Sequence, residues 1–512
     1  MSEKARHQPP VERSPVRHPE RREVSDGFPL EPGSGEQNLV VGGRVLWSRT
    51  GVALGCFVVC ASALYVGHRL HTGRAFELPK PKFFKSASER GLRSGGPIPT
   101  AAENKYKPPP RLVTTVQPIE EPPNKQVLVK FFRALRRTQQ KQPGAITRIC
   151  HWGDSQIVSD NITSTIRLRL QQKFGDAGHG FLMVGHPASY NHANVWHWSK
   201  GWSFAGVAQG FQKDHWYGIA GLHAVSGRLG PVVRYKTKAE YPVGKHVSRF
   251  QVSYLQHAMG GRFQLSVDGV LHQTVNTRGE PKQEKLLDIR VPDGVHKFSI
   301  HNIGFGVNRF FGVALERDTP GIIYDSLGLK GAQLHDLLKN DPAHWSRQLS
   351  WRKPNLMVVG FGTNESYQEI PIQNYPPMWS KLLQQLRAAR PGASCLVLGP
   401  VDRVHEYKYS HPRTKPLRDA MRQVALAEGC AFWDTYTAMG GNKAALHWRK
   451  AGLMWGDLAH MNPQGGRKLG GLIAQALIER YQSWLQQTQY QEKLHKRPPA
   501  NPTPTPTPTP TR

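Results

Sequence analysis

The chain has 512 residues, with 68 Lys and Arg against 37 Asp and Glu, and therefore a formal net charge of +31. Apolar residues make up 38%, and the 50 Gly and 40 Pro follow no fixed period, which excludes a collagen-like or wholly disordered chain. Five cysteines in a chain of this length exclude a disulfide-stapled secreted scaffold. The excess of basic residues raises nucleic-acid binding as a first hypothesis.

The N-terminal part predicts a tail followed by a membrane anchor. Residues 1–43 are polar, rich in Pro and without apolar periodicity, which is typical of a disordered tail. Within residues 44–70, the stretch 50–67 carries no charged side chain, and as a helix it would be about 27 Å long, enough to cross a bilayer core. We therefore predict a single transmembrane helix. A cleaved signal peptide is disfavoured, because about 45 residues precede the apolar stretch.

Two further segments lack the apolar content of a folded domain. Residues 71–123 are rich in Pro, Lys and Arg and predict an extended linker. Residues 488–512 end in a Pro-Thr repeat and predict a disordered tail. The foldable part of the chain lies between them.

Residues 124–184 and 317–487 show apolar strand-like runs that alternate with helical patterns. This alternation predicts an α/β domain in two parts, a parallel sheet with helices on both faces. We expect strands at 146–153, 321–328, 355–362, 394–401 and 430–436, and helices at about 155–173, 374–389, 414–428 and 464–485.

Residues 185–316 differ from both flanking parts. They contain short alternating runs separated by Gly and Asp turns, without a convincing helical pattern. The segment predicts a β-sandwich inserted into the α/β domain.

Ser155 directly follows the first expected strand and a Gly-Asp turn. A serine in this place can present its hydroxyl at the carboxyl edge of the sheet, where open α/β folds bind ligands. The same residues also suit an ordinary helix N-cap.

Near the other end of the domain, Asp457 and His460 are three residues apart. A carboxylate on Nδ1 would fix the imidazole tautomer and leave Nε2 free to take a proton from a serine. A capping Asp beside a surface His is the alternative.

Two further segments follow expected strands. Asn364, in a Gly loop, could donate to an oxyanion or be a turn residue. Gly328 and Gly331 could each be turn glycines.

Together these four segments resemble the blocks of the SGNH (GDSL-type) hydrolase superfamily. The matching residues are Gly153-Asp154-Ser155, Gly328 to Gly331, Gly362-Thr363-Asn364 and Asp457 to His460. The resemblance implies that Ser155 is the nucleophile, His460 the base and Asp457 its orienting acid. It also implies an oxyanion hole made by the backbone N–H groups of Ser155 and Gly331 and by the Asn364 side chain.

Other catalytic classes lack their motifs. No G-x-S-x-G elbow surrounds Ser155, which argues against an ordinary α/β-hydrolase. No H-E-x-x-H motif or Cys/His ligand cluster occurs, so we expect neither a metal nor another cofactor.

The layout of the chain narrows the resemblance further. A hydrolase of this type with a β-sandwich inserted after its first block, behind an anchor, looks like the bacterial peptidoglycan O-acetylesterases, whose insert is similar to carbohydrate-binding modules. That implies a serine esterase that removes O-acetyl groups from a cell-wall glycan through an acetyl-serine. Two alternatives stay open: an acetyltransferase with the same triad, and an inactive glycan-binding membrane protein.

Aromatic side chains are dense at the start of the insert. Their flat faces could stack on sugar rings, or they could form the core of the sandwich. The candidates for sugar binding are Trp196, Trp198, Trp202 and Trp216.

Three cysteines lie in expected core strands: Cys150, Cys395 and Cys430. We predict that all three are buried free thiols rather than disulfide-bonded.

The positive charge belongs to the foldable part of the chain. Residues 1–123 carry a net charge of +6, and residues 124–512 carry +25, of which 185–316 contribute +7. With no zinc-finger spacing, RNP signature or basic heptad helix, nucleic acid is not an expected partner. The charge suits anionic cell-envelope polymers instead.

We expect a protein of the inner membrane with its catalytic domain in the periplasm. Basic residues flank the apolar stretch on both sides, and the positive-inside rule taken literally would place the domain in the cytoplasm. The orientation therefore stays open.

Overall fold

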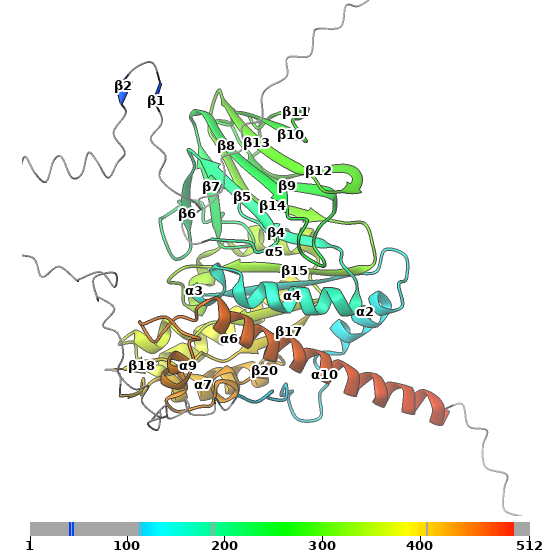
Figure 1. Ribbon diagram of the computed structural model, residues 1–512, viewed down its shortest axis with the longest axis vertical. Helices are drawn as coiled ribbons and strands as arrows, with labels where there is room; N and C mark the ends of the chain where they lie inside the picture. The colour runs from blue at the N-terminus through cyan, green and yellow to red at the C-terminus, as the bar shows by residue number, and fades with distance from the viewer. Residues whose placement is uncertain are drawn as a thin grey trace, which may run out of the picture. The chain divides into compact units, whose positions relative to one another are not determined.

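The computed structural model describes residues 112, 114–185, 187, 190–405 and 408–495, besides the short strands β1 (Val40–Val41) and β2 (Arg44–Val45) (Figure 1). The chain divides into two units, residues 1–107 and 108–512. The predicted anchor at 50–67 lies outside the described residues. Among the residues that are described, no helix is long and apolar enough to span a bilayer.

A five-stranded parallel sheet lies in the second unit. Its order is β15 (Gly321–Gly328), β3 (Ile146–Gly153), β16 (Leu356–Gly360), β17 (Ser394–Leu398) and β20 (Ala431–Trp433). All neighbouring pairs are parallel. The sequence prediction of a parallel sheet is confirmed.

Helices cover both faces of this sheet because its strands are apolar on both sides. On β16, Leu356 and Val358 enter one core, whereas Met357 and Val359 enter the other, as the two-residue period of a strand requires. The first core is closed by α2 (Val129–Gln139), α4 (Asn161–Phe174), α8 (Thr435–Met439), α9 (Ala444–Lys450) and α10 (Pro463–His495). The second is closed by α5 (Pro342–Arg352), α6 (Tyr375–Ala389) and α7 (Thr414–Ala427).

The helix expected at 155–173 is broken in two. The short α3 (Ser155–Val158) ends before Asp160, which has a φ of +60° and precedes α4. The buried Asp160 carboxylate pairs with Arg167 at 2.6 Å and accepts from the Ala193 N–H at 2.9 Å. Contacts with α4 and with the segment before β5 therefore fix the left-handed residue that separates the two helices.

Both predicted borders of the α/β domain are wrong by several residues. Helix α10 continues to His495, so residues 488–495 are helical rather than part of a tail. At the other end, Glu120 pairs with Phe432 of β20 through two backbone hydrogen bonds of 2.9 Å, and Ile119 is buried. The last residues of the expected linker therefore extend the edge of the parallel sheet.

Two antiparallel sheets follow α4 in the chain and pack against each other. One has the order β11-β10-β13-β8-β5, and the other the order β12-β9-β14-β7-β6. Their strands are β5 (Val195–Lys200), β6 (Ser203–Gly206), β7 (Leu222–Ser226), β8 (Leu229–Thr237), β9 (Val247–Gln256), β10 (Arg262–Val267), β11 (Val270–Asn276), β12 (Gln283–Gly294), β13 (Lys297–Gly304) and β14 (Asn308–Glu316). Stacked rings, such as Phe250 on Phe298 at 4.5 Å, fill the space between the sheets.

The strand β4 (Gly178–Leu182) differs from the sequence prediction. It was expected on the α/β side of the border at 185, but it pairs antiparallel with β14. Strand β4 pairs with β14 of the antiparallel sheet and also contacts β15, the edge strand of the parallel sheet. It therefore lies where the antiparallel and parallel sheets meet (Figure 1).

The prediction of three free thiols is wrong for two of them. Cys395 of β17 and Cys430, the residue before β20, form a disulfide with their Cα atoms 4.7 Å apart. Their strands are neighbours in the sheet, which brings together cysteines 35 residues apart in sequence. Cys150 is buried and free, as predicted.

Candidate active site

Ser155, His460 and Asp457 form a continuous line of hydrogen bonds. Ser155 is the first residue of α3, directly beyond the carboxyl end of β3, and its Oγ lies 2.8 Å from His460 Nε2. His460 Nδ1 lies 2.6 Å from Asp457 Oδ2. The structure thus brings Ser155 together with His460, which is 305 positions later in the sequence, and with its neighbour Asp457.

The loop that carries Asp457 and His460 turns through a left-handed residue. Leu458 has a φ of +53°, and its side chain is buried. This conformation, which is rare for a leucine, lets Asp457 Oδ1 accept from the backbone N–H groups of Ala459 and His460 at 3.1 and 3.0 Å. Backbone and side-chain bonds therefore orient the carboxylate toward the imidazole.

These hydrogen bonds keep Asp457 ionised. Partial burial alone would raise its pKa, but the bonds from the His460 backbone and side chain and from Ala459 outweigh it and hold the pKa below its ordinary value. An ionised Asp457 favours the tautomer with the proton on Nδ1, and Nε2 is then free to accept the Ser155 proton.

Gln156, which the sequence did not single out, fixes the loop that carries Asp457 and His460, here called the histidine loop, to α3. Its Nε2 donates to the Ala459 carbonyl at 2.6 Å, and its Oε1 accepts from the Met461 N–H at 3.4 Å. The two bonds fall on either side of His460. The only sequence signal was its position directly after Ser155.

The segments predicted to form the oxyanion hole also meet at this edge of the sheet. The Leu329 N–H donates to the Gly153 carbonyl at 2.8 Å, and Asn364 Nδ2 donates to the Ala332 carbonyl at 2.8 Å. Within the part of the chain that the structure describes, neither the Ser155 nor the Gly331 N–H donates a hydrogen bond. Both N–H groups therefore remain available to a substrate oxygen.

The two candidate glycines stand in different surroundings. A Cβ on Gly328 would lie 2.8 Å from the Val158 nitrogen, so this glycine permits close packing of β15 against α3. Gly331 has a φ of +75°, and a Cβ there would meet nothing within 4 Å. The geometry favours Gly331 as the residue that faces a substrate.

Two buried carboxyl groups brace these loops and were also missed. Glu365 accepts from the N–H groups of Gly362 and Leu334 at 3.0 and 2.7 Å, and burial raises its pKa to about 8. Asp154 accepts from the Gln156 N–H at 3.0 Å and from Thr363, and burial raises its pKa as well. Each carboxyl group has one partner nearby in sequence and another in a distant segment, Leu334 for Glu365 and Thr363 for Asp154, which no local pattern reveals.

The four tryptophans proposed for sugar binding do not form one site. Trp216 stacks on His344 with centroids 5.0 Å apart, and Lys282 lies 4.0 Å from its ring centroid. Trp202 packs edge-on against Phe310 at 5.4 Å, and Trp198 lies beside Arg234. Trp196 differs from the other three because it lines a large cavity.

Comparison with known proteins agrees with the geometry. Residues 302–468 match the GDSL-like Lipase/Acylhydrolase family, a segment that holds the Asn364 and His460 blocks but not Ser155. No curated protein sequence matches the chain.

One solved structure shares the fold. A peptidoglycan O-acetylesterase is 23% identical, with a TM-score of 0.60, covering 69% of this chain and 96% of its own. Two others have TM-scores of 0.26 and carry no weight. One is a lipase/acylhydrolase from Enterococcus faecalis, which is 19% identical and covers 31% of this chain and 77% of its own. The other is a family two carbohydrate esterase from Cellvibrio japonicus, which is 10% identical and covers 56% of this chain and 99% of its own.

The recognition made from the sequence motifs is therefore confirmed. Ser155 lies outside the matched segment because about 170 residues separate it from the next block at Gly328, and the fold brings the two blocks together. Residues 302–468 match the GDSL-like Lipase/Acylhydrolase family, and the chain shares its fold with a solved peptidoglycan O-acetylesterase.

Proposed function

We propose that the chain is a serine carbohydrate esterase that removes O-acetyl groups from a cell-wall glycan, with peptidoglycan as its substrate. The observation that carries the proposal is the line Ser155–His460–Asp457, with hydrogen bonds of 2.8 and 2.6 Å at the carboxyl edge of the sheet. The fold shared with a peptidoglycan O-acetylesterase supports the choice of glycan.

In the proposed reaction, Ser155 Oγ attacks the acetyl carbonyl while His460 Nε2 takes its proton. The Ser155 and Gly331 N–H groups and the Asn364 amide donate to the oxyanion, and Asp457 stabilises the imidazolium. When the bond to the sugar oxygen breaks, His460 gives the proton to that oxygen and acetyl-serine remains. Water then loses a proton to His460 and attacks the acetyl carbonyl. As the bond to Ser155 Oγ breaks, His460 gives the proton to Oγ and acetate leaves.

Hydrolysis is favoured over transfer to a second sugar by the exposure of the triad. The side chains of His460 and Asp457 are 42% and 48% exposed, so water has access to the place where the acyl-enzyme would form. A purely glycan-binding role is disfavoured by the completeness of the hydrogen-bonded triad.

We further propose that the catalytic domain acts in the periplasm, tethered by residues 50–67. The Cys395–Cys430 disulfide supports this location, because such bonds persist in oxidising compartments. A reporter fused after Pro123 tests the orientation. A cytoplasmic reporter signal would rule out the cell wall as substrate.

The activity is tested by p-nitrophenyl acetate turnover with the full chain and with Ser155→Ala. We expect turnover that the substitution reduces by a factor of 10³ or more, as removal of a nucleophile does. Acetate release should be faster from O-acetylated peptidoglycan than from acetylated xylan. A clear preference for xylan would contradict the choice of glycan, and equal turnover by Ser155→Ala would contradict the mechanism.

A further inference from the structure

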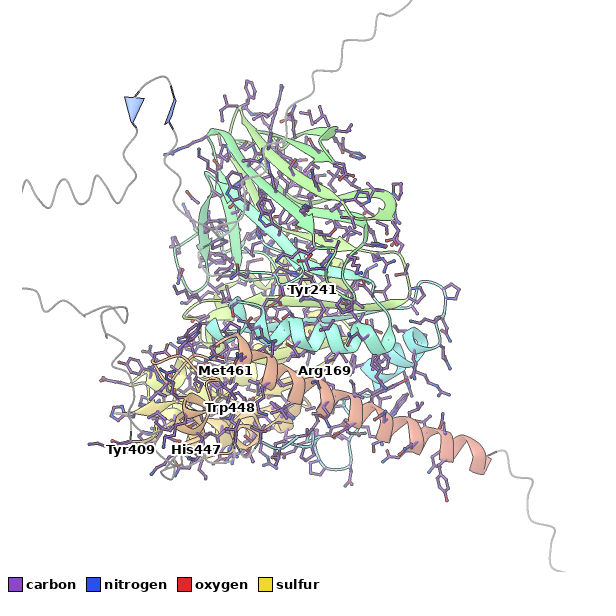
Figure 2. The ribbon with its side chains drawn as sticks, in the orientation of Figure 1. Arg169, Tyr241, Tyr409, His447, Trp448 and Met461 are labelled. Carbon is purple, nitrogen blue, oxygen red and sulfur yellow. A yellow bond between two sulfur atoms is a disulfide. The ribbon has the colours of Figure 1, made fainter. Side chains whose placement is uncertain are left out.

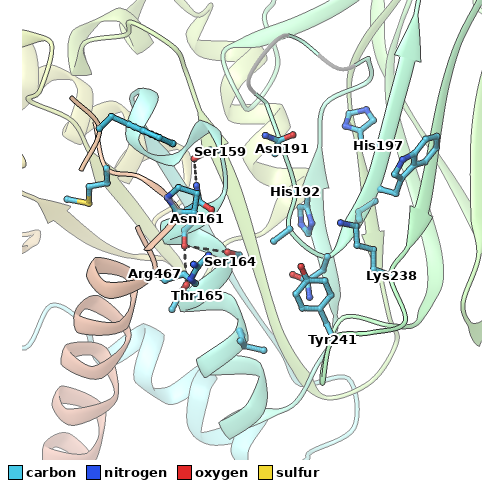
Figure 3. A pocket seen from close by; sticks show the side chains of 18 residues that line it. Ser159, Asn161, Ser164, Thr165, Asn191, His192, His197, Lys238, Tyr241 and Arg467 are labelled. Atoms are coloured by element: carbon cyan, nitrogen blue, oxygen red, sulfur yellow. Dashed lines mark hydrogen bonds between the residues drawn. The ribbon is translucent and has the colours of Figure 1, made fainter. Parts of the chain in front are cut away.

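A cavity of about 630 Å³ lies between the antiparallel sheets and the helices that carry the active site. One wall comes from residues 191–197 together with Lys238 and Tyr241, and the opposite wall from the start of α4 and the start of α10 (Figure 3). Figure 2 places Tyr241 near the antiparallel sheets and Met461 beside the start of α10. We call this cavity the flanking pocket.

The flanking pocket adjoins the catalytic histidine. Met461, which directly follows His460, is one of its lining residues. Trp455 is another, and its N–H donates to the His460 carbonyl at 2.9 Å. A ligand in the pocket would therefore lie against the loop that presents His460 to Ser155.

The lining combines aromatic rings with amides and hydroxyls. Trp196 and Tyr241 lie on the sheet side, and Trp455 on the loop side is 56% exposed. Flat rings stack on the faces of sugars, and the amides and hydroxyls, such as Asn191 and Ser164, can bond sugar hydroxyl and acetamido groups. The volume falls within the range of pockets that enclose small organic ligands.

The charge of the lining is entirely positive. Lys238 and Arg467 stand on opposite walls, and among the described residues no Asp or Glu lines the pocket (Figure 3). Within the described part of the chain neither cation forms an ion pair, whereas Arg309 of β14, a central strand of one antiparallel sheet, pairs with Asp214 at 2.8 Å. Two unpaired cations facing one cavity attract an anionic ligand.

His192 adds nothing to this charge. Burial lowers the pKa of His192 to about 3, so its imidazole is neutral at pH 7. The nearby Asp160 carboxylate is buried and paired with Arg167 at 2.6 Å, so it does not neutralise Lys238 or Arg467. The positive charge that faces the cavity belongs to those two side chains.

We propose that the flanking pocket binds the part of the glycan that lies beside the acetyl group, and that Lys238 and Arg467 select a glycan bearing a carboxylate there. The inference rests on the proposed function and adds the residues that determine its specificity. Lys and Arg form charge-assisted hydrogen bonds with a carboxylate. A neutral amide in place of the carboxylate cannot form such bonds.

The test compares O-acetylated peptidoglycan fragments with the same fragments after their carboxylates are converted to amides. For the full-length wild-type chain we expect kcat/KM to be about tenfold or more higher for the carboxylate form. Lys238→Gln and Arg467→Gln should each reduce this ratio, and the double variant should bring it close to one. Lys450→Gln removes an exposed cation at the end of α9, outside the pocket, and should keep the wild-type ratio.

A second arm identifies the source of the carboxylate. Fragments stripped of their peptides keep the preference if the carboxylate sits on the sugar, and lose it if it sits on the peptide. A third arm needs no turnover: in the Ser155→Ala background, calorimetry should show tighter binding of the carboxylate form, and adding both pocket substitutions should abolish that difference.

The inference and the proposed function fail in different ways. A ratio near one for the wild type, or an unchanged ratio in the double variant, would overturn the role of Lys238 and Arg467 while Ser155-dependent acetate release persists. Loss of the ratio in Lys450→Gln as well would show a general charge effect and would equally overturn it. Turnover that does not depend on Ser155 would overturn the proposed function itself.

Discussion

The side chain of Asn364 connects the loop that follows β16 to the turn at Gly331. Its Nδ2 donates to the Ala332 carbonyl at 2.8 Å, which leaves the second N–H of the amide for a substrate oxygen. We predict that Asn364→Ala lowers kcat for p-nitrophenyl acetate about 10²–10³-fold, the usual effect of removing one oxyanion donor. Asn364→Asp, which cannot donate, should be at least as impaired. Asn374→Ala, an exposed asparagine before α6 whose side chain caps nothing, is the control. A full rate in Asn364→Ala would exclude the oxyanion role.

Glu365 gives a prediction about stability and pH. Burial raises its pKa to about 8 from an ordinary value of 4.5. Between these values the folded chain keeps a proton that the unfolded chain releases, so this group makes the free energy of unfolding fall as the pH rises, with no further loss above pH 8. Glu365→Gln carries no such proton. Relative to wild type, its free energy of unfolding should therefore rise by a few kcal/mol between pH 4.5 and 8.5.

Urea unfolding at several pH values measures this difference. Glu369→Gln, four residues away and exposed, is the control for the loss of a surface carboxylate. A constant difference for Glu365→Gln would mean that the group titrates alike in the folded and unfolded chain.

At the scale of elements, α3 is too short to hold the histidine loop by packing. The side chain of Gln156 links α3 to the histidine loop by hydrogen bonds instead. We predict that Gln156→Ala lowers kcat about tenfold with little change in KM, because His460 loses the bonds on either side of it. Gln156→Glu should not restore the rate, since the Ala459 carbonyl needs a donor. Steady-state kinetics together with melting temperatures separate this positioning effect from a loss of stability. Restoration by Glu would contradict the role of the donor.

The elements also show how far local sequence determines the fold. The strands β3 and β15 have the predicted bounds because each is a short, mostly apolar run that ends at a glycine, Gly153 or Gly328. The break at Asp160 depends on Arg167 and on Ala193, which no periodicity connects to it. The Cys395–Cys430 bond depends on which strands are neighbours, and sequence order alone does not determine that.

The same limit applies to the site. Ser155, Asp457 and His460 were recognisable because each lies in a short motif at the end of an element. Gln156 and Glu365 were not, because their hydrogen-bond partners lie in segments far along the chain.

At the scale of the whole molecule, the net charge of +25 on residues 124–512 predicts how the enzyme meets its substrate. A positive field raises the local concentration of an anionic polymer, and salt reduces this effect because the screening length falls from about 10 Å at 0.1 M to about 3 Å at 1 M. We predict that kcat/KM for O-acetylated peptidoglycan falls several-fold over this range. The rate with p-nitrophenyl acetate, which is uncharged, should change less than about twofold over the same range, because screening acts on charged partners.

Acetylated xylan, as a neutral polymer, separates the effect of charge from that of polymer size. Its kcat/KM should follow p-nitrophenyl acetate, so the ratio of peptidoglycan to xylan turnover should fall as salt rises. If the three substrates respond to salt alike, the charge acts on the fold or on solubility rather than on the encounter. If only peptidoglycan responds, the basic surface belongs to substrate capture, and the effect should be strongest at low ionic strength.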